Sequence, residues 1–210
     1  TGFVYKLASA DTANLVYKRM DKTVNLNYNI DCFNFTFDNS LYSYGGYGFW
    51  KTNGILRKFN EKDKEWDVTP LNKEVIGTSY LWLSPDDGRL YLPFQRVVNA
   101  GIGGPENIKG IPDYTSYYLD IKNKQWVKLG QLEKEVIDIV QNDFSSRQYV
   151  TYKNGYLHGV NEETYLFDIR NNKVYKSKNP NLNQFLIRRA SAENMFISGD
   201  KVYSYDLTTQ

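Results

Sequence analysis

The sequence predicts an all-β protein built from repeated antiparallel units of four strands. Aromatic residues make up 16% of the 210 residues, with 18 Tyr, 11 Phe and 4 Trp, and such side chains suit the pleated, half-buried surface of a sheet. A register of strand, acidic or amide residue, polar turn and aromatic residue recurs along the chain. Helix-forming segments are scarce, and only 131–141 (QLEKEVIDIVQ) is compatible with a short helix.

The repeated register consists of an apolar strand that ends in Asp or Asn, a polar turn, and an aromatic residue six positions after the acid or amide. It occurs at 59–66 (FNEKDKEW), 119–126 (LDIKNKQW) and 167–174 (FDIRNNKV), and the last eight residues, YSYDLTTQ, begin a fourth copy. The third copy has Val174 in place of the Trp. Each copy predicts a hairpin whose second strand begins with a large side chain that packs between sheets.

Two further strand-like runs precede each of these turns, so each unit has four strands. Before the third turn, for example, QYVTY and YLHGV are joined by Lys-Asn-Gly, a strong hairpin signal. The predicted units are 1–24 (partial), 31–71, 79–129, 148–177 and 185–210 (partial). Four strands per unit at spacings of about 40 to 60 residues is typical of a β-propeller. We therefore expect a single domain over 1–210. It is either a ring of four to five blades whose first and last segments share one blade, which removes exposed edges, or a fragment of a larger ring.

The unit at 31–71 resembles the kelch motif. A Gly-Gly doublet follows Tyr44 at the end of the second strand, and Asn60 and Trp66 lie downstream. The unit at 79–129 keeps the acid and the Trp but has Pro-Phe where the glycines belong. The resemblance implies a kelch-like β-propeller, similar to galactose-oxidase-type domains, and implies no particular activity.

Composition excludes several partners and bears on location. The formal net charge of +2, from 26 basic and 24 acidic residues, provides no field that attracts nucleic acid. No apolar run approaches the roughly 20 residues of a membrane span, so we expect no membrane insertion of this segment. Similar repeats occur in secreted bacterial proteins and sensor ectodomains, so the resemblance implies an extracytoplasmic location, periplasmic or secreted. The chain begins with Thr1, and we expect a processed protein or a piece of a longer one.

Metal, cofactor and catalytic sites are not predicted. His158 is the only histidine and Cys32 the only cysteine, which excludes an intrachain disulfide and the usual zinc sites. A copper oxidase of the galactose-oxidase kind needs two histidines, so that activity does not follow from the resemblance. The glycine-rich run at 101–104 lacks the strand-to-helix context of a phosphate loop.

Two enzymatic interpretations remain as alternatives. The hairpin at 84–91 (SPDDGRLY) resembles a structural motif of sialidase-like propellers, yet Arg147, Arg188 and Arg189 show no spacing that predicts a converging triad. Asp138 and Asp143 are candidates for the two carboxylates of a carbohydrate-active hydrolase or lyase, although a solvated connecting loop explains them as well.

Two connections between the second and third strands of successive units are the candidate binding face. They span 47–54 and 96–113, and the segment 138–147 is a third contributor. Equivalent connections of a propeller lie on one face. Exposed aromatic side chains on that face would stack on a sugar, a peptide or a planar ligand. The alternative is that Phe49 and Trp50 fold back and plug the ring. The candidate binding residues are Tyr47, Phe49, Trp50, Lys51, Arg96, Asn99, Glu106 and Arg147.

These observations favour a non-catalytic binding protein. We expect a β-propeller that binds a protein or carbohydrate ligand, as the sensor or interaction domain of an exported bacterial protein. The alternatives are the carbohydrate-active hydrolase or lyase and a purely structural domain that spaces the parts of a longer protein.

Overall fold

The structure is a computed structural model of residues 1–210. It describes residues 3–11, 14–23, 32–48, 51–76, 81–97, 111–135, 149–152, 154–160, 163–182, 195–198 and 201–204. In chain order the strands are β1 (Tyr5–Asp11), β2 (Asn14–Arg19), β3 (Phe33–Phe37), β4 (Ser40–Tyr44), β5 (Tyr47–Gly48), β6 (Lys51–Thr52), β7 (Leu56–Asn60), β8 (Glu65–Thr69), β9 (Trp82–Leu83), β10 (Arg89–Leu92), β11 (Gln95–Val97), β12 (Ile111–Asp113), β13 (Thr115–Asp120), β14 (Gln125–Gln131), β15 (Tyr149–Tyr152), β16 (Gly155–Val160), β17 (Glu163–Asp168), β18 (Lys173–Lys176), β19 (Met195–Ser198) and β20 (Lys201–Ser204). The prediction of an all-β protein with antiparallel sheets is confirmed.

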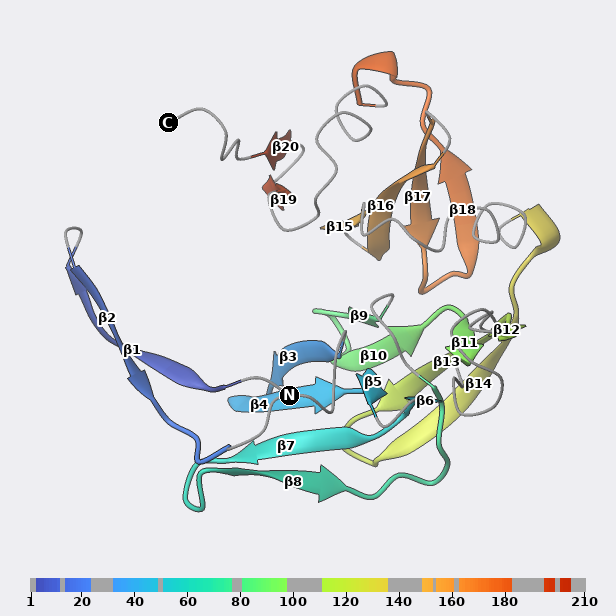
Figure 1. The fold of residues 1–210 in the computed structure, drawn as a ribbon. Helices are drawn as coiled ribbons and strands as arrows, with labels where there is room; N and C mark the ends of the chain where they lie inside the picture. The colour runs from blue at the N-terminus through green and yellow to red at the C-terminus, as the bar shows by residue number, and fades with distance from the viewer. Residues whose placement is uncertain are drawn as a thin grey trace, which may run out of the picture. The chain divides into compact units, whose positions relative to one another are not determined.

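Three of the sheets have four strands each (Figure 1). Across each of these sheets the strands lie in the order in which they occur along the chain. The orders are β3-β4-β7-β8, β9-β10-β13-β14 and β15-β16-β17-β18, and the short hairpins β5–β6 and β11–β12 interrupt the first two. β1–β2 and β19–β20 are further two-stranded sheets. None of these sheets closes on itself within the described residues. The three larger sheets correspond to the units predicted from the repeated register.

The repeated register is a turn held by a pair of carboxylate and amide side chains three residues apart. In the second copy, Asp120 accepts hydrogen bonds from the backbone N–H (3.0 Å) and the side-chain amide (2.9 Å) of Asn123. The third copy repeats this arrangement, whereas the first exchanges the roles: Asn60 Nδ2 donates to Asp63 Oδ2 at 2.7 Å. The three pairs are Asn60–Asp63, Asp120–Asn123 and Asp168–Asn171. The register therefore reflects turn chemistry, in which Asn and Asp bond to the backbone a few residues on.

The chain divides into two compact units, each of which is discontinuous in sequence. The first comprises Thr1–Leu81, Gln95–Asp113 and Asp120–Trp126, and the second comprises Trp82–Phe94, Tyr114–Leu119 and Val127–Gln210. The prediction of a single domain stays a prediction.

The core of the first unit forms around Tyr44, which is fully buried. Its ring lies 5.4 Å from that of Trp126 in an edge-to-face arrangement, and its hydroxyl donates a hydrogen bond to the carbonyl of Val75. Burial raises the pKa of the Tyr44 hydroxyl, so it remains a donor. Asn72 in turn holds the backbone of Trp126, accepting from its N–H at 2.8 Å. Trp66, which occupies the matching position in the first copy, is only partly buried and packs on Phe59 of its own sheet, with ring centroids 5.4 Å apart.

The core of the second unit consists of aliphatic and aromatic side chains from several strands. Its most deeply buried members are Trp82, Leu90, Tyr91, Leu92, Phe94, Leu119 and Phe167. The hairpin at 84–91 is a structural turn, because Asp87 accepts hydrogen bonds from the backbone N–H of Arg89 (3.1 Å) and the hydroxyl of Tyr91 (2.9 Å). Within the described part of the predicted helix 131–141, Lys134 and Glu135 are helical, while Gln131 ends β14.

The hairpin β1–β2 is anchored to the first unit by a buried carboxylate. Asp21 is 7% exposed and accepts hydrogen bonds from the backbone N–H groups of Val4 (2.9 Å) and Thr23 (3.0 Å) and from the Arg19 side chain (3.3 Å). Burial alone would raise the pKa of this carboxyl, but these hydrogen bonds outweigh it and hold the pKa well below its usual range. Asp21 therefore stabilises the folded chain as an anion.

Candidate functional site

Both connections of the predicted binding face are hairpins at their base. The sequence predicts no strands in these two connections, but the structure pairs Tyr47 with Thr52 in β5–β6 and Gln95 with Asp113 in β11–β12. The difference arises because these strands have only two or three residues, too few for an alternating pattern to be visible.

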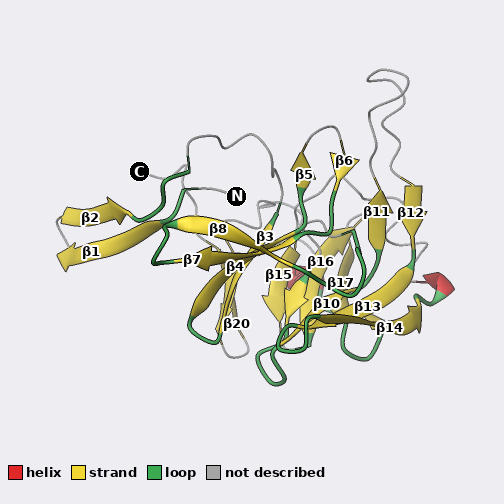
Figure 2. Cartoon of the chain, turned by 90° about the horizontal axis from the view of Figure 1, so that it is seen from below, coloured by secondary structure: helices red, strands yellow, loops and turns green. Residues whose placement is uncertain are grey.

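The two hairpins are neighbours in the first unit. β6 contacts β11, and both hairpins project toward the same side, at the top of Figure 2. We call the residues 47–52, 95–97 and 111–113, together with the connections they carry, the hairpin surface.

The structure describes only part of the predicted binding set. Tyr47 lies half-buried on β5, Lys51 is exposed on β6, and the backbone of Arg96 is paired with Pro112 in β11–β12. Phe49, Trp50, Asn99, Glu106 and Arg147 lie outside the described residues. Asp138, Asp143, Arg188 and Arg189 lie outside them as well.

Asn53 closes the base of the first hairpin. It is 6% exposed, and its backbone N–H and side-chain amide both donate to the carbonyl of Gly46, at 2.9 and 3.0 Å. Its Oδ1 accepts from the N–H of Ile55 at 3.2 Å. Gly45 and Gly46 have φ values of 65° and 100°, a region that side chains with a Cβ rarely enter. The Gly-Gly doublet of the sequence thus turns the chain into the hairpin.

Gln95 closes the base of the second hairpin. It is 8% exposed, its Oε1 accepts from the backbone N–H of Ile76 at 2.7 Å, and its Nε2 donates to Asp113 at 3.0 Å. In the same segment, Glu74 accepts from the N–H of Gly54 at 3.1 Å. Residues 74–76 therefore fasten both hairpins through hydrogen bonds. No pattern in the sequence distinguishes Asn53, Glu74 or Gln95, because polar residues at the ends of short strands are common.

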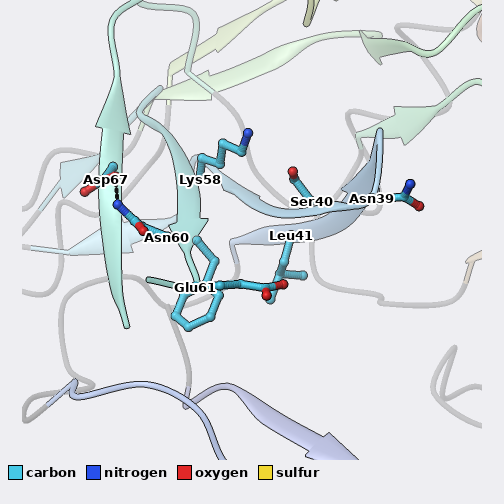
Figure 3. Close-up of a pocket in the computed structure, with 8 residues that line it drawn as sticks. Asn39, Ser40, Leu41, Lys58, Asn60, Glu61 and Asp67 are labelled. Carbon is cyan, nitrogen blue, oxygen red and sulfur yellow. Dashed lines mark hydrogen bonds between the residues drawn. The ribbon is translucent and has the colours of Figure 1, made fainter. Parts of the chain in front are cut away.

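A pocket of about 500 Å³ lies at the turn end of the sheet β3-β4-β7-β8 (Figure 3). Asn39, Ser40 and Leu41 line one side, and residues 58–61 with Asp67 line the other. The connection that carries β5–β6 joins β4 to β7, so in this meander it leaves the sheet at the opposite end. None of the pocket residues belongs to the predicted binding set.

The described carboxyl groups with a resolved pKa shift, Asp21, Asp87 and Glu163, are all shifted downward. For Asp87, burial would raise the pKa, but the nearby Ser84 hydroxyl and the hydrogen bonds from the N–H of Arg89 and the hydroxyl of Tyr91 outweigh it. For Glu163 the main cause is its contact with Lys176, followed by the hydroxyl of Tyr165. A general acid needs the opposite shift. These three carboxylates therefore have structural roles in turns and strand pairs.

Two further properties concern the described residues only. No group of three or more His, Cys, Asp or Glu side chains lies close enough together there to hold a metal ion. No helix in the described part of the chain is long and apolar enough to cross a membrane.

Comparison with known proteins shows similarity in fold. No family model matches the sequence, and no curated protein matches it. Among solved structures, 80 chains match. One of them, the structure of YjhT, has a TM-score of 0.56 and 13% sequence identity over 83% of this chain and 58% of the other. At that identity the similarity extends to the fold alone, and this chain spans 58% of the length of the YjhT chain.

Proposed function

We propose that this chain is a kelch-like β-propeller, or part of one, that binds a protein or carbohydrate ligand without catalysis through the hairpin surface. Three successive four-stranded sheets with the same turn chemistry support the propeller arrangement. The similarity in fold to the structure of YjhT extends over 83% of the chain.

The observation that carries the binding proposal is the shared anchor of the two hairpins. Glu74 accepts a hydrogen bond from the N–H of Gly54 at the base of the first hairpin. The N–H of Ile76 donates to Gln95 at the base of the second hairpin. A site is most precise when rigid elements position it. In the sequence, Phe49 and Trp50 follow β5 and residues 98–110 follow β11. Aromatic residues next to a cation in the sequence, such as Lys51, suit both a peptide and a sugar.

A non-catalytic role agrees with the electrostatics of the described carboxylates. Asp21, Asp87 and Glu163 are held as anions by hydrogen bonds, whereas glycoside cleavage requires a carboxyl with a raised pKa. The small net charge of +2 disfavours nucleic acid as a partner. We further propose that the chain functions outside the cytoplasm, as a sensor or interaction domain of an exported bacterial protein.

The test compares the wild type with the Trp50→Ala variant on a glycan array and against a phage-displayed peptide library. We expect at least one ligand whose affinity falls about tenfold or more on truncation of Trp50, because buried aromatic anchors dominate binding energies. Tyr175→Ala is the matched control, since Tyr175 is a 50% exposed aromatic residue on β18. Unchanged binding of every ligand by Trp50→Ala would rule out the hairpin surface as the site. Turnover of chromogenic glycosides by the wild type would instead favour the hydrolase alternative.

A further inference from the structure

The pocket in Figure 3 exists because two paired strands separate before they end. The register between β4 and β7 pairs Tyr44 with Leu56 and ends at Tyr42 and Lys58. β4 nevertheless extends back to Ser40 and β7 extends forward to Asn60. Beyond the last pair the two strands diverge, so the pocket receives side chains from both faces of the sheet.

The turn that borders the pocket is fixed by its backbone. Asp38 and Asn39 join β3 to β4 with φ values of 48° and 53°, which is the geometry of a two-residue type I′ hairpin turn. Phe37 and Ser40 are paired directly beside it. The side of the pocket formed by Asn39 and Ser40 is therefore rigid.

The other side is organised by the carboxamide of Asn60. Its Nδ2 donates to Asp67 at 3.0 Å and to Asp63 at 2.7 Å, and its Oδ1 accepts from the N–H groups of Lys62 (3.1 Å) and Asp63 (3.2 Å). With four hydrogen bonds, the amide cannot turn. It fixes one oxygen of Asp67, and Figure 3 shows Asp67 and Asn60 side by side on this wall. The Asp67 carboxylate thus has a set orientation before any ligand arrives.

The charged pair beside the pocket departs from the repeat. Lys58 and Asp67 are directly opposite each other on β7 and β8. In the third sheet, the same register position holds Leu166 opposite Tyr175. The fold therefore accepts an apolar pair at this position. An ammonium opposite a carboxylate is also a favourable cross-strand pair, and in the first sheet this pair places one cation and one anion at the pocket.

The lining distinguishes between classes of ligand. One ammonium, Lys58, stands against the two carboxylates of Glu61 and Asp67, so phosphate and other anions are disfavoured. The described residues contain no cluster of three metal-ligating side chains. Leu41 and Phe59 are the only apolar residues of the lining, which is too little for an apolar ligand. What remains is a compound that both donates and accepts many hydrogen bonds and carries a small apolar patch.

We propose that this pocket binds a neutral saccharide unit. Asp67 and Glu61 accept hydrogen bonds from hydroxyl groups, Lys58 donates to hydroxyl or ring oxygens, and Ser40 does both. The C–H face of the sugar ring packs on Leu41, while Phe59, which is 7% exposed and packed on Trp66, closes the floor of the pocket. The site lies at the end of the sheet away from the hairpin surface, and it does not depend on the function proposed for that surface.

The test is a titration followed by amide chemical shifts in NMR spectra. The probes are the methyl α-pyranosides of glucose, mannose and galactose, and N-acetylglucosamine, each up to about 50 mM. We expect at least one probe to shift the amide signals of 39–41, 58–61 and 67 with a dissociation constant on the order of 1 mM, since an open pocket gives a monosaccharide few desolvated contacts.

Two matched variants decide the role of the pocket. Asp67→Asn removes the charge of the lining carboxylate and is expected to weaken binding about tenfold. Glu65→Gln makes the same change two residues away on β8, outside the lining, and is expected to leave binding within twofold. The chemical-shift dispersion of each variant checks that it is folded.

Three results would overturn the proposal: no shift with any of the four probes, sugar-induced shifts confined to residues 47–52 and 95–97, or the same pocket shifts produced by inorganic phosphate or Ca²⁺ but not by a sugar. Equal binding by Asp67→Asn and the wild type would also overturn it.

Discussion

A methyl group at Gly54 would collide with the segment that fastens the hairpin surface. An ideal Cβ at this position lies 2.2 Å from the carbonyl oxygen of Val75, 2.7 Å from its carbonyl carbon and 2.9 Å from its nitrogen. Non-bonded heavy atoms prefer separations of about 3.5 Å. The Gly54→Ala substitution must therefore move one of the two backbones by roughly 1 Å.

The energetic cost has two parts. Forcing extra volume into a packed site costs about 1 to 3 kcal/mol. The displaced Val75 carbonyl is also the acceptor of the buried Tyr44 hydroxyl, and leaving that buried pair unmade costs about 1 to 3 kcal/mol more. We expect Gly54→Ala to lower the free energy of unfolding by about 4 kcal/mol, a large share of the roughly 5 to 15 kcal/mol that domains usually have.

The assay is urea denaturation followed by tryptophan fluorescence, arranged as a double-mutant cycle with Tyr44→Phe. Tyr44→Phe alone should cost about 1 to 2 kcal/mol, and clearly less in the Gly54→Ala background, where the hydrogen bond is already broken. Gly130→Ala is the control, because a Cβ there meets no heavy atom within 4 Å and bears only the strain of a φ of 150°. A loss below about 1 kcal/mol for Gly54→Ala, or full additivity with Tyr44→Phe, would refute the reasoning.

Two further substitutions test the anchors of the fold by the same denaturation assay. Asp21→Asn should cost about 2 to 3 kcal/mol at pH 7, because it removes the anion that accepts four hydrogen bonds. Since the folded-state pKa of Asp21 is depressed, the carboxylate stabilises the fold above the unfolded pKa of about 3.9, and its advantage over Asn shrinks as the pH falls below that value. A difference that persists unchanged at pH 3 would contradict this. Asn60→Asp alone should cost about 1 to 2 kcal/mol, because it places a carboxylate at the 2.7 Å contact with Asp63 and at the 3.0 Å contact with Asp67. Adding Asp63→Asn should recover about half of that loss, because the pair then matches that of Asp120 and Asn123 while the contact with Asp67 stays repulsive; a double variant no more stable than the single one would argue against interchangeable turns.

The strand repeat could be predicted because it depends on local chemistry. Asn60, Asp120 and Asp168 mark turns whose hydrogen bonds reach only three residues along the chain, so the signal is contained in short windows of sequence. The position of a Trp after the turn was less informative, since burial is set by the packing of whole sheets. Trp126 is 3% exposed beside Tyr44, whereas Trp66 remains partly exposed.

The candidate sites were harder to predict because both depend on non-local register. Gln95 belongs to the site through its bond to Ile76, 19 residues away, and no pattern along the chain relates the two. The pocket depends on where the pairing of β4 and β7 ends, which is a property of two strands separated by a hairpin. One signal was available: Lys58 and Asp67 occupy the register position that Leu166 and Tyr175 fill in the third sheet, and aligning the copies residue by residue would have exposed the difference.

The two proposed sites share one strand, and this predicts how they affect each other. β7 follows Gly54 at the base of the first hairpin and ends at Asn60 in the pocket wall, and between these ends it is paired with β8 along its whole length. A strand fixed in this way transmits a change only if its register shifts, which would break the pairing. A saccharide in the pocket should therefore leave Trp50-dependent binding unchanged, and Asp67→Asn should leave it unchanged too. Cooperative binding at the two ends would show that β7 moves, and the rigid-anchor argument for the hairpin surface would then fail along with the independence of the pocket.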